Sequence, residues 1–139
     1  MPDAGTFEEI AMPKRPCPFC SPADDRIVRA FDAVLVLRDG FPISPGHTLI
    51  VPRRRVGSFF DLTSDEQAGM LEALNWAKGE LAQSRHPDAF NVGLNDGPAA
   101  GQTVPHCHLQ LIPRHAGDVA DPRGGVRWVV PSKAKYWPD

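Results

Sequence analysis

The chain has 139 residues, of which 42% are hydrophobic and 23% are charged, a length and composition that allow one domain with a packed core. The formal net charge of −2 excludes a general polyanion-binding surface, so we expect no nucleic-acid partner. No apolar run approaches the roughly 20 residues that cross a bilayer, and the N-terminus lacks the layout of a signal peptide. We therefore expect a cytoplasmic protein without membrane contact.

The two ends of the chain differ from its middle. Residues 1–15 are polar and punctuated by proline, which predicts an irregular N-terminal arm. Residues 16–139 are predicted to form a single domain that includes an aromatic C-terminal tail with Trp128, Tyr136 and Trp137. Because the tail has aromatic side chains but no period, two interpretations stay open: the tail packs on a partner subunit, or it covers a site.

The predicted domain begins with the pattern Cys17-Pro18-Phe19-Cys20. The chain has 3 cysteines, which are too few and too clustered for a disulfide framework. Metal binding and simple burial are the two interpretations of this pair.

Two short apolar runs come next, at residues 34–37 and 48–51. Both are rich in β-branched side chains, and they are bounded by Asp39-Gly40, Pro45-Gly46 and Pro52, which is typical of strands joined by tight turns. We expect two neighbouring strands.

A long helix follows these strands. Thr63-x-x-Glu66 forms a capping box, and His86-Pro87 marks the end because a residue before proline disfavours the α conformation. The predicted helix is amphipathic and about five turns long. Its apolar positions are Met70, Leu71, Leu74, Ala77 and Leu81.

Two further alternating runs, residues 90–95 and 105–113, are predicted to be strands. In the second run, a period of two places three polar side chains on one face and three core side chains on the other. The polar set is His106, His108 and Gln110, and the core set is Cys107, Leu109 and Leu111. Strands, one long helix and strands again predict an antiparallel α+β domain.

The segment before the last strand has the ingredients of a phosphate site. Gly101 permits close backbone approach, and Gln102 and Thr103 add free N–H groups and side-chain donors. An isolated His-x-His pattern more often marks surface residues or a core pair, and it is also a possible metal pair, although Gln110 is a poor third ligand. The order and spacing of the preceding loop favour a reactive histidine.

Residues 95–111, Asn-Asp-Gly-Pro-Ala-Ala-Gly-Gln-Thr-Val-Pro-His-Cys-His-Leu-Gln-Leu, resemble the signature of the histidine triad (HIT) superfamily. Residues 38–52 are similar to the ribose-binding strand-loop-strand of this family, and residues 117–127 resemble its small bacterial, hydrolase-like branch. The resemblance covers roughly residues 17–136 and implies an antiparallel sheet of about five strands with two helices, usually as a homodimer.

The resemblance also implies roles for the two histidines. His108 would be the nucleophile that attacks the α-phosphorus and becomes nucleotidylated, which suits an imidazole near neutral pH. In the family, a backbone carbonyl of the first motif histidine holds the second ring nitrogen, so His106 would be a supporting residue.

The implied substrate is a nucleotide, most often an adenine nucleotide. Asp39 resembles the carboxylate that takes both ribose hydroxyls, and Asn95 resembles the residue on the ribose-phosphate side. The phosphoryl oxygens would be held by a group of donors before the last strand. These donors come from Gly101, Gln102, Thr103 and Val104.

Gln110 stands where the family usually has its third histidine, and glutamine donates a hydrogen bond but carries no proton to a leaving group. Its presence leaves three functions open. The first is hydrolysis of dinucleoside polyphosphates or nucleoside phosphoramidates through a nucleotidyl-histidine intermediate, as the overall resemblance implies. The second is a nucleotidyltransferase or phosphorylase that passes the nucleotidyl group to phosphate, since His-x-His-x-Gln resembles those branches. The third is a nucleotide-binding module with little turnover.

Cys17 and Cys20 resemble half of the zinc site of many family members, which a histidine after Pro52 and the first motif histidine complete. Arg55 occupies the position of the former histidine, and a cation there repels zinc. We expect a lost zinc site, with zinc at the cysteine pair as the alternative. The implied mechanism requires no cofactor, although magnesium bound to a polyphosphate substrate is compatible with it.

Overall fold

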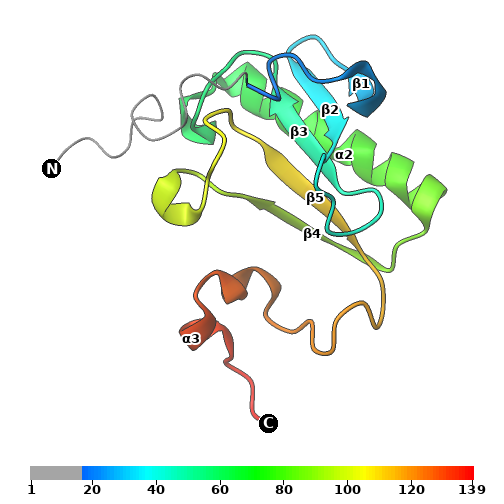
Figure 1. Ribbon diagram of the computed structural model, residues 1–139, viewed down its shortest axis with the longest axis vertical. Coiled ribbons are helices and arrows are strands. Elements are labelled where there is room, and N and C mark those ends of the chain that lie inside the picture. The colour runs from blue at the N-terminus through cyan, green and yellow to red at the C-terminus, as the bar shows by residue number, and fades with distance from the viewer. Residues whose placement is uncertain (1–16) are drawn as a thin grey trace, which may run out of the picture.

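The computed structural model describes residues 17–139, so the expected arm at residues 1–15 lies outside the described residues. A single five-stranded antiparallel sheet with the order β1-β2-β3-β5-β4 organises the chain, as Figure 1 shows. This arrangement confirms the predicted antiparallel α+β architecture. The strands are β1 (Ile27–Ala30), β2 (Val34–Arg38), β3 (Thr48–Pro52), β4 (Ala89–Leu94) and β5 (Leu109–Arg114).

The two apolar runs form the neighbouring strands β2 and β3, as predicted. They pair antiparallel, with Val36 opposite Ile50. Nearly every residue of the pair is buried because these strands are central in the sheet and covered on both faces. The register sets Arg38 opposite Thr48, so the residues just beyond them, Asp39 and His47, are neighbours at the strand ends.

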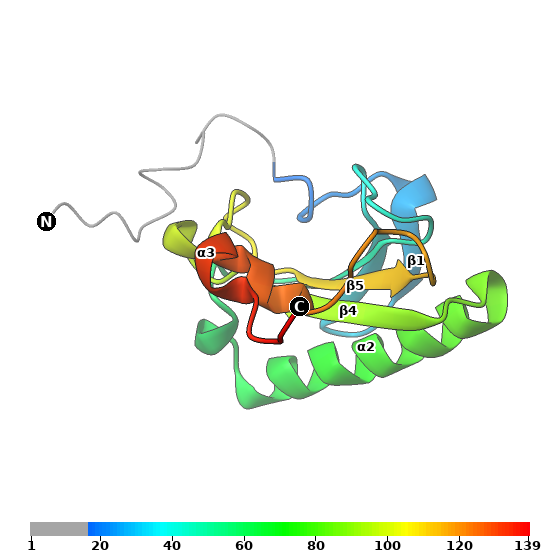
Figure 2. The same cartoon turned by 90° about the horizontal axis from the view of Figure 1, so that it is seen from below.

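The 22-residue helix α2 (Ser64–Arg85) lies along one face of the sheet (Figure 2). Both halves of the predicted capping box are present, with Thr63 and Glu66 exchanging side-chain and backbone bonds. The buried positions are Met70, Ala73, Ala77 and Leu81. The predicted core position Leu71 is wrong, because its side chain is 52% exposed and lies a helical step away from this buried stripe.

The helix ends where Pro87 predicted, and the residue before this proline lies outside the right-handed α region, as expected. His86 takes the left-handed conformation, with φ 50° and ψ 49°. A left-handed residue is a common way to end a helix. The turn leads directly into β4, which pairs antiparallel with β5.

The strand β5 begins at Leu109, later than predicted, so His106, Cys107 and His108 precede it. The alternation still holds around its start: Cys107, Leu109 and Leu111 belong to the core under α2. The side chains of His108, Gln110 and Ile112 are half-buried on the opposite side.

The aromatic tail folds into a 3₁₀ turn (Gly125–Val129) and the one-turn helix α3 (Pro131–Ala134), which lie beside β4 (Figures 1 and 2). Arg127 ties the two together by donating hydrogen bonds to the carbonyl oxygens of Lys133 and Ala134. In residues 17–139, no helix has the length and apolar character needed to span a membrane.

Candidate active site

His108 lies immediately before β5, and two contacts hold its imidazole ring. The Nδ1 atom is 2.8 Å from the carbonyl oxygen of His106. A carbonyl only accepts hydrogen bonds, so Nδ1 carries the proton and Nε2 carries the free lone pair. The ring of Phe19 packs against the imidazole with a centroid distance of 4.9 Å. His108 therefore has the tautomer and the fixed orientation of a nucleophile.

Gln110 is oriented by His47, a histidine at the end of the β2–β3 connection. The backbone N–H of Ile43 donates to His47 Nδ1 at 3.2 Å, which leaves the ring proton on Nε2. This Nε2 atom lies 2.9 Å from Gln110 Oε1. Because His47 donates, the amide oxygen must face it, and the NH₂ group of Gln110 is turned away from His47 and is available to another acceptor.

Asp39 lies beside the same histidine. One carboxylate oxygen accepts from the N–H of Phe41 at 2.8 Å, and the other lies 3.4 Å from His47 Nε2. The first contact is the usual turn-forming role of an aspartate before glycine. The second oxygen is the one available to a ligand, and its bond to ribose stays a prediction.

The loop before β5 is held together by the side chain of Gln102. Its Oε1 accepts from the N–H of Gly97 at 2.7 Å, and its Nε2 donates to the carbonyl oxygens of Gly57 and Val104 at 2.8 and 3.0 Å. Both amide hydrogens are in use, so a phosphoryl contact by this side chain, which stays a prediction, requires the exchange of one of these bonds. Gln102 thus organises the loop.

The remaining predicted phosphate ligands are backbone groups of this loop. Within residues 17–139, the N–H groups of Thr103 and Val104 have no protein acceptor, which leaves them free for an oxyanion. Gly101 has φ +95°, a conformation that glycine adopts without strain. The nearest side-chain atom to an added Cβ there is Nδ2 of Asn95, at 4.0 Å. Loop and Asn95 are therefore close neighbours.

His106 is fully buried against the cysteine pair. Its Nε2 is 2.6 Å from the carbonyl oxygen of Pro52 and must donate, so the Nδ1 lone pair points the other way. That Nδ1 atom lies 3.2 Å from Cys17 Sγ and 3.5 Å from Cys20 Sγ. Three potential metal ligands therefore meet, each with a donor atom available.

The donor set fits three of the four positions of a tetrahedral zinc site. Burial lowers the pKa of His106, and the charge of Arg55 lowers it further, which keeps the imidazole neutral. Burial also raises the pKa of the Cys20 thiol, while Arg55 acts in the opposite direction. Arg55 thus lies within electrostatic reach of two of the three ligands and repels a cation. Both the lost zinc site and its alternative, zinc at the cysteine pair, stay predictions.

Cys107 has no place in this chemistry. Its side chain is fully buried in the core under α2, and burial raises its pKa to about 12. A thiol of this kind stays protonated and acts as a small apolar side chain, as the sequence predicted.

The sequence pattern did not reveal two of the residues that shape this site. Neither His47 nor Phe19 was assigned a role from the sequence. The pairing of the runs at residues 34–37 and 48–51 is the signal that could have found His47, because it brings His47 next to Asp39. For Phe19, which contacts His106 and His108 across 87 or more positions of sequence, no local signal exists.

Comparison with known proteins yields one family. The model of the HIT domain matches residues 21–117. The chain is 34% identical over 117 residues to AP-4-A phosphorylase of Mycobacterium tuberculosis, covering 84% of this chain and 60% of that protein. It is 39% identical over 77 residues to a bifunctional bis(5′-adenosyl)-triphosphatase/adenylylsulfatase of Arabidopsis thaliana, covering 55% and 43%. The chain spans about half the length of the curated relatives it matches.

Solved structures agree in fold. A zinc-bound histidine triad family protein from Mycobacterium smegmatis superposes with a TM-score of 0.68 at 31% identity, covering 76% of this chain and 79% of that chain. A HIT family protein from Bacillus anthracis gives a TM-score of 0.67 at 31% identity, covering 73% and 74%. The family match includes the loop and both histidines of the site described above. The chain belongs to the HIT family.

Proposed function

We propose that the chain is a nucleotide hydrolase that acts through a nucleotidyl intermediate on His108. The observation that carries this proposal is the 2.8 Å contact between His108 Nδ1 and the carbonyl oxygen of His106. This contact places the lone pair on Nε2, and it stabilises the positive charge that the ring gains when Nε2 bonds to phosphorus.

In the first step, Nε2 forms a bond to the α-phosphorus while the bond from phosphorus to the leaving group breaks with its electron pair. In the second step, a water oxygen bonds to the same phosphorus while the bond from phosphorus to Nε2 breaks and its electron pair returns to the ring. The attacking water loses a proton to solvent, and the nucleoside monophosphate leaves with His108 in its neutral form. The free N–H groups of Thr103 and Val104 and the NH₂ group of Gln110 are the donors for the phosphoryl oxygens, where negative charge grows.

Dinucleoside polyphosphates suit this site better than phosphoramidates. A polyphosphate chain leaves as a stable anion without a proton, whereas an amine leaving group needs one. Gln110 supplies no proton. His47 behind it has its Nδ1 atom occupied by Ile43 and its Nε2 proton bonded to Gln110.

A phosphorylase is the second candidate function. Phosphate would then replace water in the second step and take the nucleotidyl group from His108, which releases a nucleoside diphosphate. Gln110 favours this alternative because its oriented amide can hold the phosphoryl oxygens of a waiting intermediate. The similarity to a relative named as an AP-4-A phosphorylase, over 84% of this chain, favours it as well.

The test is the fate of diadenosine tetraphosphate. We expect an AMP adduct on His108, detected by intact mass at neutral pH, and turnover that disappears in His108→Ala but persists in His86→Asn, a change at an exposed histidine that keeps the left-handed turn. AMP as the product supports the hydrolase, and ADP formed from added phosphate supports the phosphorylase. Binding without adduct or turnover would leave a nucleotide-binding module and refute the proposal.

A further inference from the structure

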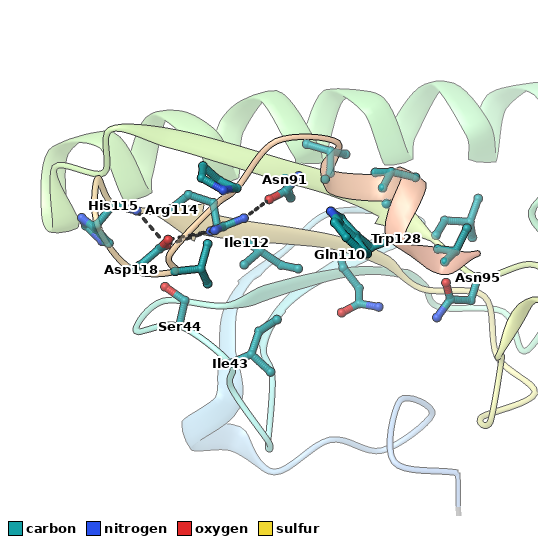
Figure 3. A pocket seen from close by; sticks show the side chains of 18 of the residues that line it. Ile43, Ser44, Asn91, Asn95, Gln110, Ile112, Arg114, His115, Asp118 and Trp128 are labelled. Carbon is teal, nitrogen blue, oxygen red and sulfur yellow. Dashed lines mark hydrogen bonds and ion pairs between the residues drawn. The ribbon is translucent and has the colours of Figure 1, made fainter. Parts of the chain in front are cut away.

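A cavity of about 810 Å³ lies over β4 and β5, between the tail and the loop that follows β2 (Figure 3). Its volume falls in the range of pockets that bury a compact organic ligand. Ile43, Ile112 and Gln110 project into the same space in Figure 3, and Trp128 of the tail forms another wall. The tail therefore forms part of the wall of this cavity.

The charges around this cavity are paired with one another. Arg114 binds Asp118 through two hydrogen bonds of 2.7 and 2.8 Å and donates a third, of 2.6 Å, to Asn91 Oδ1. Asp121 is paired with Arg123 at 3.0 Å. Because Arg114 is already bonded to Asp118 and Asn91, its guanidinium is not available to bind phosphate. This wall of the cavity therefore suits an uncharged group.

The remaining polar side chains are the hydroxyl of Ser44, the imidazole of His115 and a group of amides that includes Asn91 and Gln110. Because Asn91 Oδ1 accepts from Arg114, its Nδ2 is a free donor, and it lies 3.2 Å from where a Cβ of Gly125 would stand. Trp128 donates its indole N–H to the carbonyl oxygen of Arg123, which fixes the ring, and its side chain is 47% exposed. One fixed aromatic face and an amide donor on an apolar wall are what a purine or pyrimidine base binds.

The position of the cavity decides which nucleoside it can take. Asp39 and Phe19 lie at the half of the sheet formed by β1, β2 and β3. The cavity lies over the other half, formed by β5 and β4. Gln110 of β5 lies between the two regions, because it pairs with β3, contacts His47 and also lines the cavity. A substrate whose reacting phosphorus lies at His108 could therefore extend one arm toward Asp39 and a second arm past Gln110 into the cavity.

We propose that this cavity binds the second nucleoside of a dinucleoside polyphosphate, the one that departs with the leaving group. This inference rests on the proposed function in one respect, that the first nucleoside binds on the side of Asp39. It makes the tail a determinant of substrate class, since a phosphoramidate with a small leaving group leaves the cavity empty.

A larger side chain at Gly93, which lines the cavity, would partly fill it. It lies on β4 between Asn91 and Asn95 and opposite Gln110, and an added Cβ meets no atom within 4 Å. Gly93→Leu thus introduces an apolar side chain into the cavity without backbone strain. Gly79→Leu is the matched control, because Gly79 is exposed on α2 and its Cβ also meets nothing within 4 Å.

Binding is measured first, by calorimetry in a His108→Ala background, so that the result does not depend on turnover. Diadenosine tetraphosphate and adenosine 5′-tetraphosphate differ only by the second adenosine. We expect the dinucleotide to bind roughly tenfold more tightly, the size expected for stacking of one base. Gly93→Leu and Trp128→Ala should abolish this preference, and Gly79→Leu should keep it.

Turnover gives the second readout. The ratio of kcat/KM for diadenosine tetraphosphate to that for adenosine 5′-phosphorofluoridate, whose leaving group is one fluoride ion, should fall roughly tenfold in Gly93→Leu. Equal binding of the two tetraphosphates would overturn the inference even if the enzyme is active. An equal loss for both substrates in Gly93→Leu would also overturn it, because the cavity would then hold the first nucleoside. Preferential binding of the dinucleotide without turnover would uphold the cavity and refute the proposed function.

Discussion

The link from His47 to Gln110 offers a test of how a glutamine can replace the usual third histidine. His47 is only 3% exposed, and its Nε2 donates to Gln110 Oε1 at 2.9 Å. His47→Leu removes this donor and fills the buried position with an apolar side chain. The amide of Gln110 then loses the contact that turns its NH₂ group away from His47, the orientation that the proposed phosphoryl contact needs.

The size of the effect follows from the strength of that bond. A neutral hydrogen bond contributes about 0.5–1.5 kcal/mol, which corresponds to roughly a two- to tenfold loss in kcat if all of it orients Gln110 for the transition state. Gln110→Leu, which removes the donor itself, should cost more, up to about 100-fold. His47 also lies 3.4 Å from Asp39, so a change in KM for the nucleotide would report on the ribose side.

The assay is a double-mutant cycle with diadenosine tetraphosphate as substrate. If His47 acts through Gln110, His47→Leu should lower kcat in the wild-type background and leave it unchanged in the Gln110→Leu background. Circular dichroism and thermal unfolding of each variant separate this result from loss of the fold. An equal loss of kcat in both backgrounds would refute the reasoning, because His47 would then act through Asp39 or through the loop.

Three further outcomes follow from the contacts. Gln110→His should accelerate AMP release from adenosine phosphoramidate by about 100-fold, because an imidazole can protonate the amine, while diadenosine tetraphosphate turnover changes little; equal acceleration of both would contradict a proton-transfer role. Glu66→Gln should lower the free energy of unfolding by about 1 kcal/mol at pH 7, since Glu66 completes the helix cap and pairs with Arg54. The hydrogen bond from Arg54, followed by that from the Thr63 backbone, lowers the pKa of Glu66 from 4.5 to about 2, so the stabilisation is complete above pH 5 and is lost as the pH falls through 2. Urea unfolding at several pH values should therefore show the difference narrowing toward pH 2, and a constant difference would exclude the charge as its cause. Arg55→His should raise the zinc content per chain in elemental analysis, because it removes a cation and adds a fourth ligand; an unchanged content in a folded variant would show that the cluster does not select zinc.

Local patterns were enough to predict most of the fold. The capping box at Thr63 and Glu66 and the alternation around Leu109 are encoded within a few residues, because hydrogen bonding at a helix start and the period of a strand are local properties. Leu71 was misplaced because hydrophobicity alone does not say which side of a helix meets the sheet. The sheet selects Ala73, whose small side chain allows a close approach.

The sequence predicted those features of the site that lie within one short segment of the chain. The residue types in the loop and the tautomer partner of His108 come from one short segment. One partner of Gln102 and the burial of His106 depend on residues 45 or more positions away, at Gly57, Pro52 and the cysteine pair. No local pattern reports such contacts, since they form only when β3 and the loop before β5 come together.

Gln110 and the cavity beside it point to the same class of substrate by independent arguments. An oriented amide can hold phosphoryl oxygens but cannot protonate a leaving group, which restricts efficient reaction to leaving groups that depart as anions. A cavity of about 810 Å³ on the far side of Gln110 matches a leaving group that carries a bulky, uncharged end. A polyphosphate that ends in a nucleoside satisfies both conditions, whereas an amine satisfies neither. We therefore propose that the replacement of the third histidine and the fold of the aromatic tail act together to favour dinucleoside polyphosphates.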